Sequence, residues 1–246
     1  MRKRKAKKIA KGALLAFLGI ALVMAIAVGG AVAWFTGGEE VKNTFTMGKI
    51  KLQLDEPGWD DADGLDLRPG AVRPKDPTVS ALSGRGYMRV KLEIVDGAGA
   101  LIADEARIAL ILRTLFYDKT QTLSEEKTYS LAALEALEGQ GKIDHEYNRA
   151  AFAYAGHESG KPAVRYYNYI ANNGFFDAAR KDSAVLFTHV VIAQDWHSEG
   201  FELLSGASGY KLRLTAQAMQ ADEMADAAAA FTALNRATGV TMEVAA

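Results

Sequence analysis

The sequence predicts a mainly β protein, a mostly antiparallel sandwich with inserted helices that follows an N-terminal apolar segment. Three observations support this fold class. Several segments alternate apolar and polar residues with a period of two, which is the spacing of a half-buried strand. Those segments lie far apart in the chain with helical patterns between them, unlike a regular βαβ alternation. Four of the five prolines lie between residues 56 and 77, which favours a loop or an edge there.

Residues 1–33 predict a signal peptide. A basic head of seven Lys or Arg is followed by residues 12–33, which carry no ionisable side chain. Ala31 and Ala33 give the small-x-small pattern that a signal peptidase accepts, so we expect cleavage between Ala33 and Trp34. The alternative is an uncleaved signal anchor, since about 20 uncharged residues can also span a bilayer.

The remaining chain, residues 34–246, is predicted to form a single domain. It carries 22 basic and 30 acidic residues, and this acidic balance argues against a nucleic-acid partner. The chain has no Cys, which excludes disulfides, thiolate nucleophiles and Cys-ligated metals. Because the chain begins with a predicted signal peptide, contact with a membrane is expected during export.

The strand predictions follow from the alternation. Residues 43–54 alternate with a phase slip at Gly48, which predicts a bulged strand. Residues 87–95 alternate without a break and give the clearest strand in the chain. Residues 183–194 are apolar on both faces, as expected of a strand buried between layers. Further strands are predicted at residues 164–170 and 210–219.

Three helices are predicted from N-cap residues followed by helical spacing. Asp104 precedes residues 105–116 and Ser130 precedes residues 131–138, so the helical insertions occupy about residues 100–160. Asp222 precedes a C-terminal helix over residues 223–235.

Four blocks resemble the TasA/camelysin family of exported proteins, whose signal peptide is cleaved by a SipW-type signal peptidase. Residues 29–36 read Gly-Gly-Ala-Val-Ala-Trp-Phe-Thr, and residues 43–50 read Asn-Thr-Phe-Thr-Met-Gly-Lys-Ile. Pro-Lys-Asp-Pro-Thr-Val at residues 74–79 precedes the clearest strand, and Ala-Gln-Ala-Met-Gln-Ala-Asp at residues 216–222 precedes the C-terminal helix. Residues 97–163 carry no such block.

The resemblance implies a jelly-roll-like sandwich that forms fibres in a biofilm matrix. In such fibres the segment freed by cleavage acts as a donor strand for the next subunit, so the chain would be its own partner. On this sequence the donor strand would run through Trp34, Phe35, Val41 and Phe45. The alternative is a monomer with a frayed tail, because the Gly-Gly-Glu-Glu run at residues 37–40 has little β-propensity.

Some members of the family are described as metalloproteases, so the four histidines were tested for a zinc motif. His-Glu-x-x-His needs two imidazoles four residues apart on one helix face. After His145-Glu146, the position required for the second His is occupied by Arg149. After His157-Glu158, it is occupied by Lys161. Neither pair completes the motif, so we predict no catalytic residue, no metal ligand and no cofactor.

The leading hypothesis is a non-enzymatic protein, secreted or held at the cell surface, that serves as a structural component of a matrix. Two other classes stay open. One is a secreted metallopeptidase, and the other is a membrane-tethered binding module that uses loops such as residues 60–77.

Overall fold

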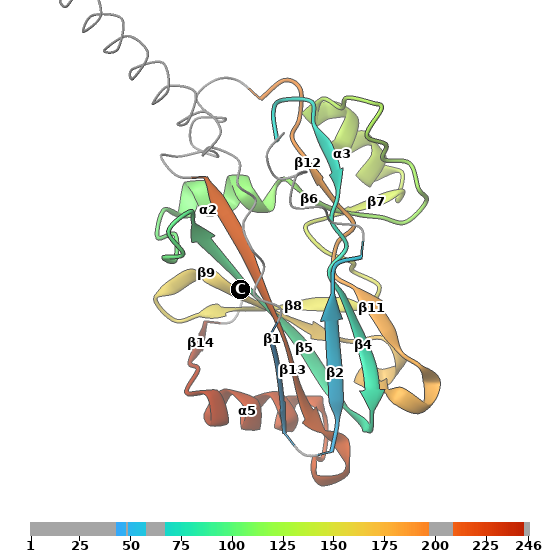
Figure 1. Cartoon of the computed structure of the whole chain (residues 1–246), viewed down its shortest axis with the longest axis vertical. Coiled ribbons are helices and arrows are strands. Elements are labelled where there is room, and N and C mark those ends of the chain that lie inside the picture. The colour runs from blue at the N-terminus through green and yellow to red at the C-terminus, as the bar shows by residue number, and fades with distance from the viewer. Residues whose placement is uncertain (1–42, 48, 58–66, 197–208, 244–246) are drawn as a thin grey trace, which may run out of the picture.

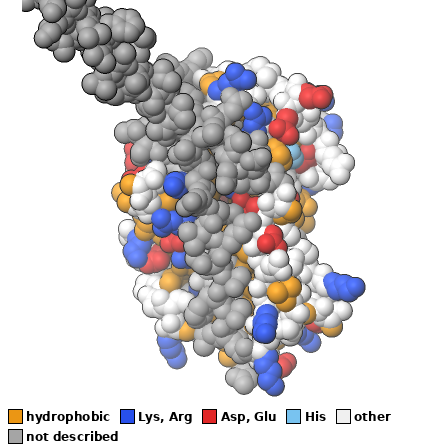
Figure 2. Space-filling view, in the orientation of Figure 1, with side chains coloured by type: hydrophobic (Ala, Val, Ile, Leu, Met, Phe, Trp, Pro, Cys, Tyr) orange, Lys and Arg blue, Asp and Glu red, His pale blue; other side chains and the backbone are white. Residues whose placement is uncertain are grey.

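The computed structural model describes residues 43–47, 49–57, 67–196 and 209–243. These residues form sheets in layers with helices at the periphery (Figure 1). Among them, no helix is long and apolar enough to cross a membrane. In the described part of the face in Figure 2, Lys and Arg side chains are scattered among Asp and Glu side chains.

The largest sheet contains seven strands, and its neighbouring strands are antiparallel except for the first pair. In spatial order the strands are β1 (Asn43–Met47), β13 (Tyr210–Gln220), β5 (Arg85–Asp96), β9 (Lys161–Tyr169), β8 (Phe152–Glu158) and β14 (Met242–Glu243), with β10 (Phe175–Asp177) paired to the start of β5.

Two smaller sheets complete the β structure. The first has the order β11 (Ser183–Val185), β4 (Thr78–Ser83) and β2 (Lys51–Asp55). The second has the order β3 (Val72–Pro74), β12 (His189–Val191), β6 (Leu115–Asp118) and β7 (Ile143–His145). The predicted mainly β fold with antiparallel sheets is therefore confirmed.

The core lies between the layers and follows from the alternation in β5. Met88, Val90, Leu92 and Ile94 are at most 1% exposed and belong to one cluster with the apolar side chains of β2 and β4. The opposite face of β5 carries Tyr87 and packs in a smaller cluster against the C-terminal helix. The large sheet is therefore covered on both faces at this end.

The first two helices begin where the sequence predicts. Asp104 accepts hydrogen bonds from the backbone N–H groups of Ala106 and Arg107 and caps α2 (Glu105–Leu112). Ser130 accepts from Ala133 and caps α3 (Leu131–Gly139). The first helix is shorter than predicted because residues 115 and 116 belong to β6.

The predicted start of the C-terminal helix is wrong. Helix α5 spans Ala227–Thr238, and its N-cap is Asp226, whose side chain accepts from the backbone N–H of Ala229. Asp222 instead lies in the 3₁₀ turn η4 (Ala221–Glu223) and accepts a hydrogen bond from Gln220. An aspartate four residues earlier gave the same sequence signal, and the true cap is the one that directly precedes the alanine run.

Two single-strand predictions are also wrong. Residues 43–54 form β1 and β2, which belong to different sheets, so the phase slip marks a change of sheet and not a bulge. Residues 183–194 form β11 and β12, again in different sheets. A chain that crosses between layers buries both of its faces, and this explains the continuous apolar run.

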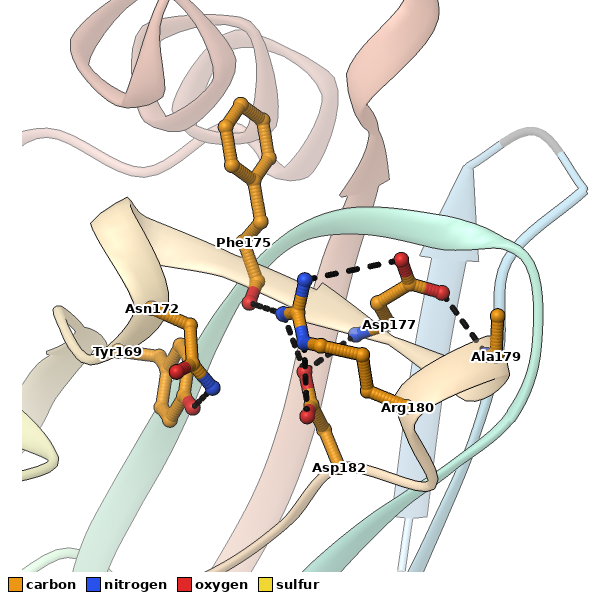
Figure 3. A network of polar contacts seen from close by, with 7 residues as sticks. All are labelled: Tyr169, Asn172, Phe175, Asp177, Ala179, Arg180 and Asp182. Carbon is orange, nitrogen blue, oxygen red and sulfur yellow. Dashed lines mark hydrogen bonds and ion pairs between the residues drawn. The ribbon is translucent and has the colours of Figure 1, made fainter.

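A turn centred on Arg180, here called the arginine corner, connects the large sheet to the three-stranded sheet (Figure 3). It contains the 3₁₀ turns η2 (Asn172–Gly174) and η3 (Ala178–Arg180) on either side of β10. The guanidinium of Arg180 donates to both carboxylate oxygens of Asp182, at 3.2 and 2.6 Å, and to the carbonyl of Phe175 at 2.6 Å. Asp182 also accepts from the backbone N–H of Asp177, which fixes the turn into β11.

Candidate functional site

The predicted signal and donor residues fall mostly outside the described part of the chain. Ala31, Ala33, Trp34, Phe35 and Val41 all lie there, as does the predicted signal or transmembrane helix. Phe45 lies in β1, opposite Gln217 of β13. The structure therefore places one end of the predicted donor segment, and it places that end at an edge of the large sheet.

Strand β1 runs parallel to β13, whereas the other named pairs among the described strands are antiparallel. Asn43 lies opposite Thr215 and Met47 opposite Met219, so β1 covers the second half of β13. The N-terminal half of β13, from Tyr210 to Leu214, is paired to β5 on its other side. The first described strand of the chain, which begins at Asn43, therefore forms this edge of the large sheet.

The opposite edge of the same sheet is β8, and it is covered by the short C-terminal strand β14. Glu243 lies opposite His157, and the Glu243 carboxylate contacts His157 Nε2 at 2.7 Å. The hydroxyl of Ser159 donates to the same carboxylate at 3.1 Å, and the Ser159 N–H donates to the carbonyl of Thr241 at 2.8 Å. β14 is thus held by a two-residue ladder, one adjoining main-chain bond and partly exposed polar contacts.

The N-terminal part of the β8 edge is blocked by a side chain. The backbone N–H of Tyr154 donates to the hydroxyl of Tyr147 at 3.4 Å. Tyr147 is held in place by Tyr167, whose ring centroid is 5.1 Å away. Arg165 stacks on Tyr154 at 4.1 Å and bonds Glu146 at 3.1 Å, which makes this cluster rigid. The part of the β8 edge open to pairing is therefore its C-terminal part, beneath β14.

A cavity of about 330 Å³ lies beside β14. Leu101, Ile102, Pro162 and Ala163 provide its apolar wall. Its polar lining includes His157, Lys161, Glu105 and Glu243. An apolar recess next to a sheet edge is the arrangement with which proteins bind an added strand, because alternate side chains of that strand need pockets.

The histidines do not converge. His145 and His189 lie on β7 and β12, on either side of Phe116 in β6 and in register with it, so a buried phenyl ring separates the two imidazoles. His157 lies on β8 with Glu243, and His197 lies outside the described residues. Within the described ranges, no group of three His, Asp or Glu side chains has the spacing of a metal site.

His145 lines a second cavity, of about 120 Å³, with Phe116, Glu135 and Glu138. Burial lowers the pKa of His145 below 6.5, and the nearby Glu146 and Glu138 offset this in part. A histidine with a lowered folded-state pKa binds fewer protons folded than unfolded, so its contribution to stability is lost as the pH falls below the unfolded pKa.

We therefore expect the free energy of unfolding to decline between about pH 7 and pH 5, and His145→Gln to make this decline shallower. Urea titrations across that range measure the slope. The same slope in the parent and in the variant would contradict the assignment to His145. Burial lowers the pKa of His189 as well, so part of the decline is expected to remain.

The contact between His157 and Glu243 was not anticipated from the sequence. Both residues are of types that are common on protein surfaces, and they are 86 positions apart in the chain. No local pattern in the sequence links these two positions.

A family model described as camelysin metallo-endopeptidase matches residues 4–82 of the chain. The match contains three of the four blocks that carry the resemblance, and it ends within β4. A comparison with curated proteins gives no match. The resemblance to the TasA/camelysin family is thus confirmed over residues 4–82, the N-terminal third of the chain.

Proposed function

We propose that the protein is an exported, non-catalytic structural component of the cell surface or extracellular matrix. Its copies assemble when the N-terminal segment freed at Trp34 adds to the sheet of the next copy. A SipW-type signal peptidase removes residues 1–33, and the membrane is a partner during export. The observation that carries the proposal is the position of β1, an N-terminal strand at an edge of the large sheet.

An edge strand of this kind is suited to assembly. A strand at an open edge gains main-chain hydrogen bonds whichever copy supplies it, so the same contacts serve within and between molecules. At the register of β1, Val41 would lie opposite Arg213, whereas Trp34 and Phe35 would extend past Tyr210, where β13 begins. A ladder continued upstream at this register would therefore run out of described β13 residues before it reached the first residues of the mature chain.

The test compares the mature chain, which starts at Trp34, with a variant that lacks residues 34–41. The mature chain is expected to form polymers visible by light scattering and electron microscopy, and the shortened chain to stay monomeric with an unchanged urea midpoint. A control of the same length, with residues 34–41 replaced by a Gly-Ser segment, separates the effect of sequence from that of length. Monomers throughout the mature sample would refute the proposal.

A second candidate is a metallopeptidase, because the family model that matches residues 4–82 is described as a camelysin metallo-endopeptidase. It predicts bound zinc near one equivalent per chain and casein cleavage that a chelator stops. Zinc content near zero, together with no chelator-sensitive cleavage by the full exported product, would eliminate it.

A further inference from the structure

We infer that the cavity of about 330 Å³ beside β14 is a binding site for a small organic cation, a protonated primary amine carried on a single ring. This site goes beyond the proposed function, because it lies within one copy of the chain and needs no assembly. Three properties of the cavity support it: an apolar wall that is already fixed, a lining whose negative charge is not compensated, and a volume that suits one ring.

The apolar wall of the cavity is fixed by the large sheet. Ile102 and Ala163 are 6% and 1% exposed and belong to the main core cluster. The backbone N–H of Ile102 donates to the carbonyl of Ile94 at 3.1 Å, and Leu101 forms an isolated bridge with Val95. The segment before α2 is thus attached to the end of β5. A ligand therefore meets an apolar surface that is already formed.

The sheet edge next to the cavity is already paired. Met242 and Glu243 of β14 lie opposite Glu158 and His157 of β8. Because β14 takes up this part of the β8 edge, a molecule in the cavity contacts side chains and needs no strand of its own. The cavity therefore suits a small molecule.

The cations that line the cavity already have carboxylate partners. The Lys161 ammonium contacts Glu158 Oε1 at 2.5 Å, and His157 Nε2 contacts Glu243 Oε2 at 2.7 Å. The exposed carboxylate of Glu105, in contrast, has no ion pair among the described residues. With these partners included, the lining is negative whether His157 is protonated or neutral.

The first turn of α2 does not reverse this sign. Asp104 accepts hydrogen bonds from the backbone N–H groups of Ala106 and Arg107, at 2.9 and 3.1 Å, so a carboxylate already neutralises the N-terminal end of the helix. An ammonium group donates three hydrogen bonds, and the carboxylates of Glu105 and Glu243 can accept them. The charge of the lining therefore favours a cation over an anion.

Volume and apolar contact define the rest of the ligand. Small-molecule sites have volumes of about 300–1,000 Å³, so a cavity of about 330 Å³ suits one ring better than a larger molecule. Leu101, which is 39% exposed, and Pro162 provide contacts for that ring. A bare metal ion would leave this apolar wall unused, and an uncharged molecule would leave the carboxylate of Glu105 uncompensated. An amine on a hydrocarbon ring satisfies both halves of the lining.

The test is a calorimetric titration of the full exported product with phenethylamine as the probe. Three analogues separate the contributions: phenethyl alcohol lacks the charge, phenylacetate carries the opposite charge, and ethylamine lacks the ring. We expect phenethyl alcohol to bind roughly three- to tenfold more weakly than phenethylamine, and phenylacetate more weakly still. Ethylamine is expected to lose at least about tenfold, because it buries no ring. Phenethylamine binding should also weaken as the salt concentration rises.

Two variants assign the binding to this cavity. Glu105→Gln removes the carboxylate that has no cation partner and is expected to weaken phenethylamine binding roughly three- to tenfold. Its control is Glu126→Gln, an exposed glutamate outside the cavity lining, which is expected to change nothing. Leu101→Ala shortens the apolar wall and is expected to weaken phenethylamine binding more than ethylamine binding. All three side chains are exposed, so the fold is expected to persist, and circular dichroism checks this.

Equal affinity for phenethylamine and phenethyl alcohol, or tighter binding of phenylacetate, would overturn the inference. A Glu105→Gln effect no larger than that of Glu126→Gln would overturn it too, because the amine would then bind elsewhere. Tighter binding of an N-acetyl-lysine amide than of phenethylamine would point to the lysine side chain of a partner protein and would contradict a free ring-bearing amine. None of these measurements requires assembly, so their failure leaves the proposed function intact.

Discussion

Lys75→Met is expected to lower the free energy of unfolding by about 3–5 kcal/mol. The Lys75 ammonium contacts Glu56 Oε2 at 2.6 Å, and the two side chains are 7% and 1% exposed. The other carboxylate oxygen of Glu56 has no hydrogen-bond partner among the described residues. Removal of the cation therefore leaves a buried carboxylate without its ion pair to Lys75. Urea unfolding followed by tryptophan fluorescence measures the loss.

Two controls separate the buried pair from a general effect of charge. Arg149→Met breaks the pair between Arg149 and Glu138, whose side chains are 50% and 33% exposed, and is expected to cost about 1 kcal/mol or less. The double variant Lys75→Met with Glu56→Leu removes both charges and is expected to recover most of the stability. A Lys75→Met effect no larger than that of Arg149→Met would contradict this account.

Gly86→Val is expected to cost about 3 kcal/mol, because a side chain at this position has no space. A Cβ on Gly86 would lie 2.4 Å from the carbonyl oxygen of Met219 and 2.7 Å from Cδ1 of Ile50. The first contact is with the backbone of β13, which cannot move without opening the β5–β13 ladder at Gln220. Thermal unfolding and amide exchange along β13 would report both effects.

The control for Gly86 is Gly139, at the C-terminal end of α3. A Cβ there meets nothing within 4 Å, so Gly139→Ala is expected to be neutral or slightly stabilising. If Gly86→Val unfolds at the temperature of the parent protein, the close approach of the two strands at this point is not the constraint proposed.

The elements that the sequence predicts correctly are those whose signal lies within their own residues. The strand over β5 follows from four buried side chains at alternate positions, and the caps at Asp104 and Ser130 follow from side chains that bond to the next turn. These signals are local, because the residues that satisfy the pattern lie within one element. They were sufficient for the fold class.

Partners distant in the sequence explain what sequence analysis missed. β6 and β7 have four and three residues, too few to show a period of two, and they form a sheet with strands more than 40 positions away. The breaks that separate β1 from β2, and β11 from β12, depend on which sheet each half joins. Alternation gives the burial of a residue but not the layer that buries it.

Only one half of the candidate site, the N-terminal segment, could be predicted from the sequence. The apolar leader and the residues from Trp34 onward are visible as a pattern in the sequence, and the family match covers them. The β8 edge, its cover by Glu243 and the block by Tyr147 depend on contacts across 86 and 7 positions between residue types that are common on surfaces. Such contacts appear only when the sheet is assembled.

The most direct test of the central claim is the intact mass of the subunits recovered from the sedimentable extracellular fraction of the producing cells. We predict a mass corresponding to a chain that starts at Trp34, found in polymers. A full-length chain that still carries residues 1–33, recovered as a monomer from the membrane, would contradict it.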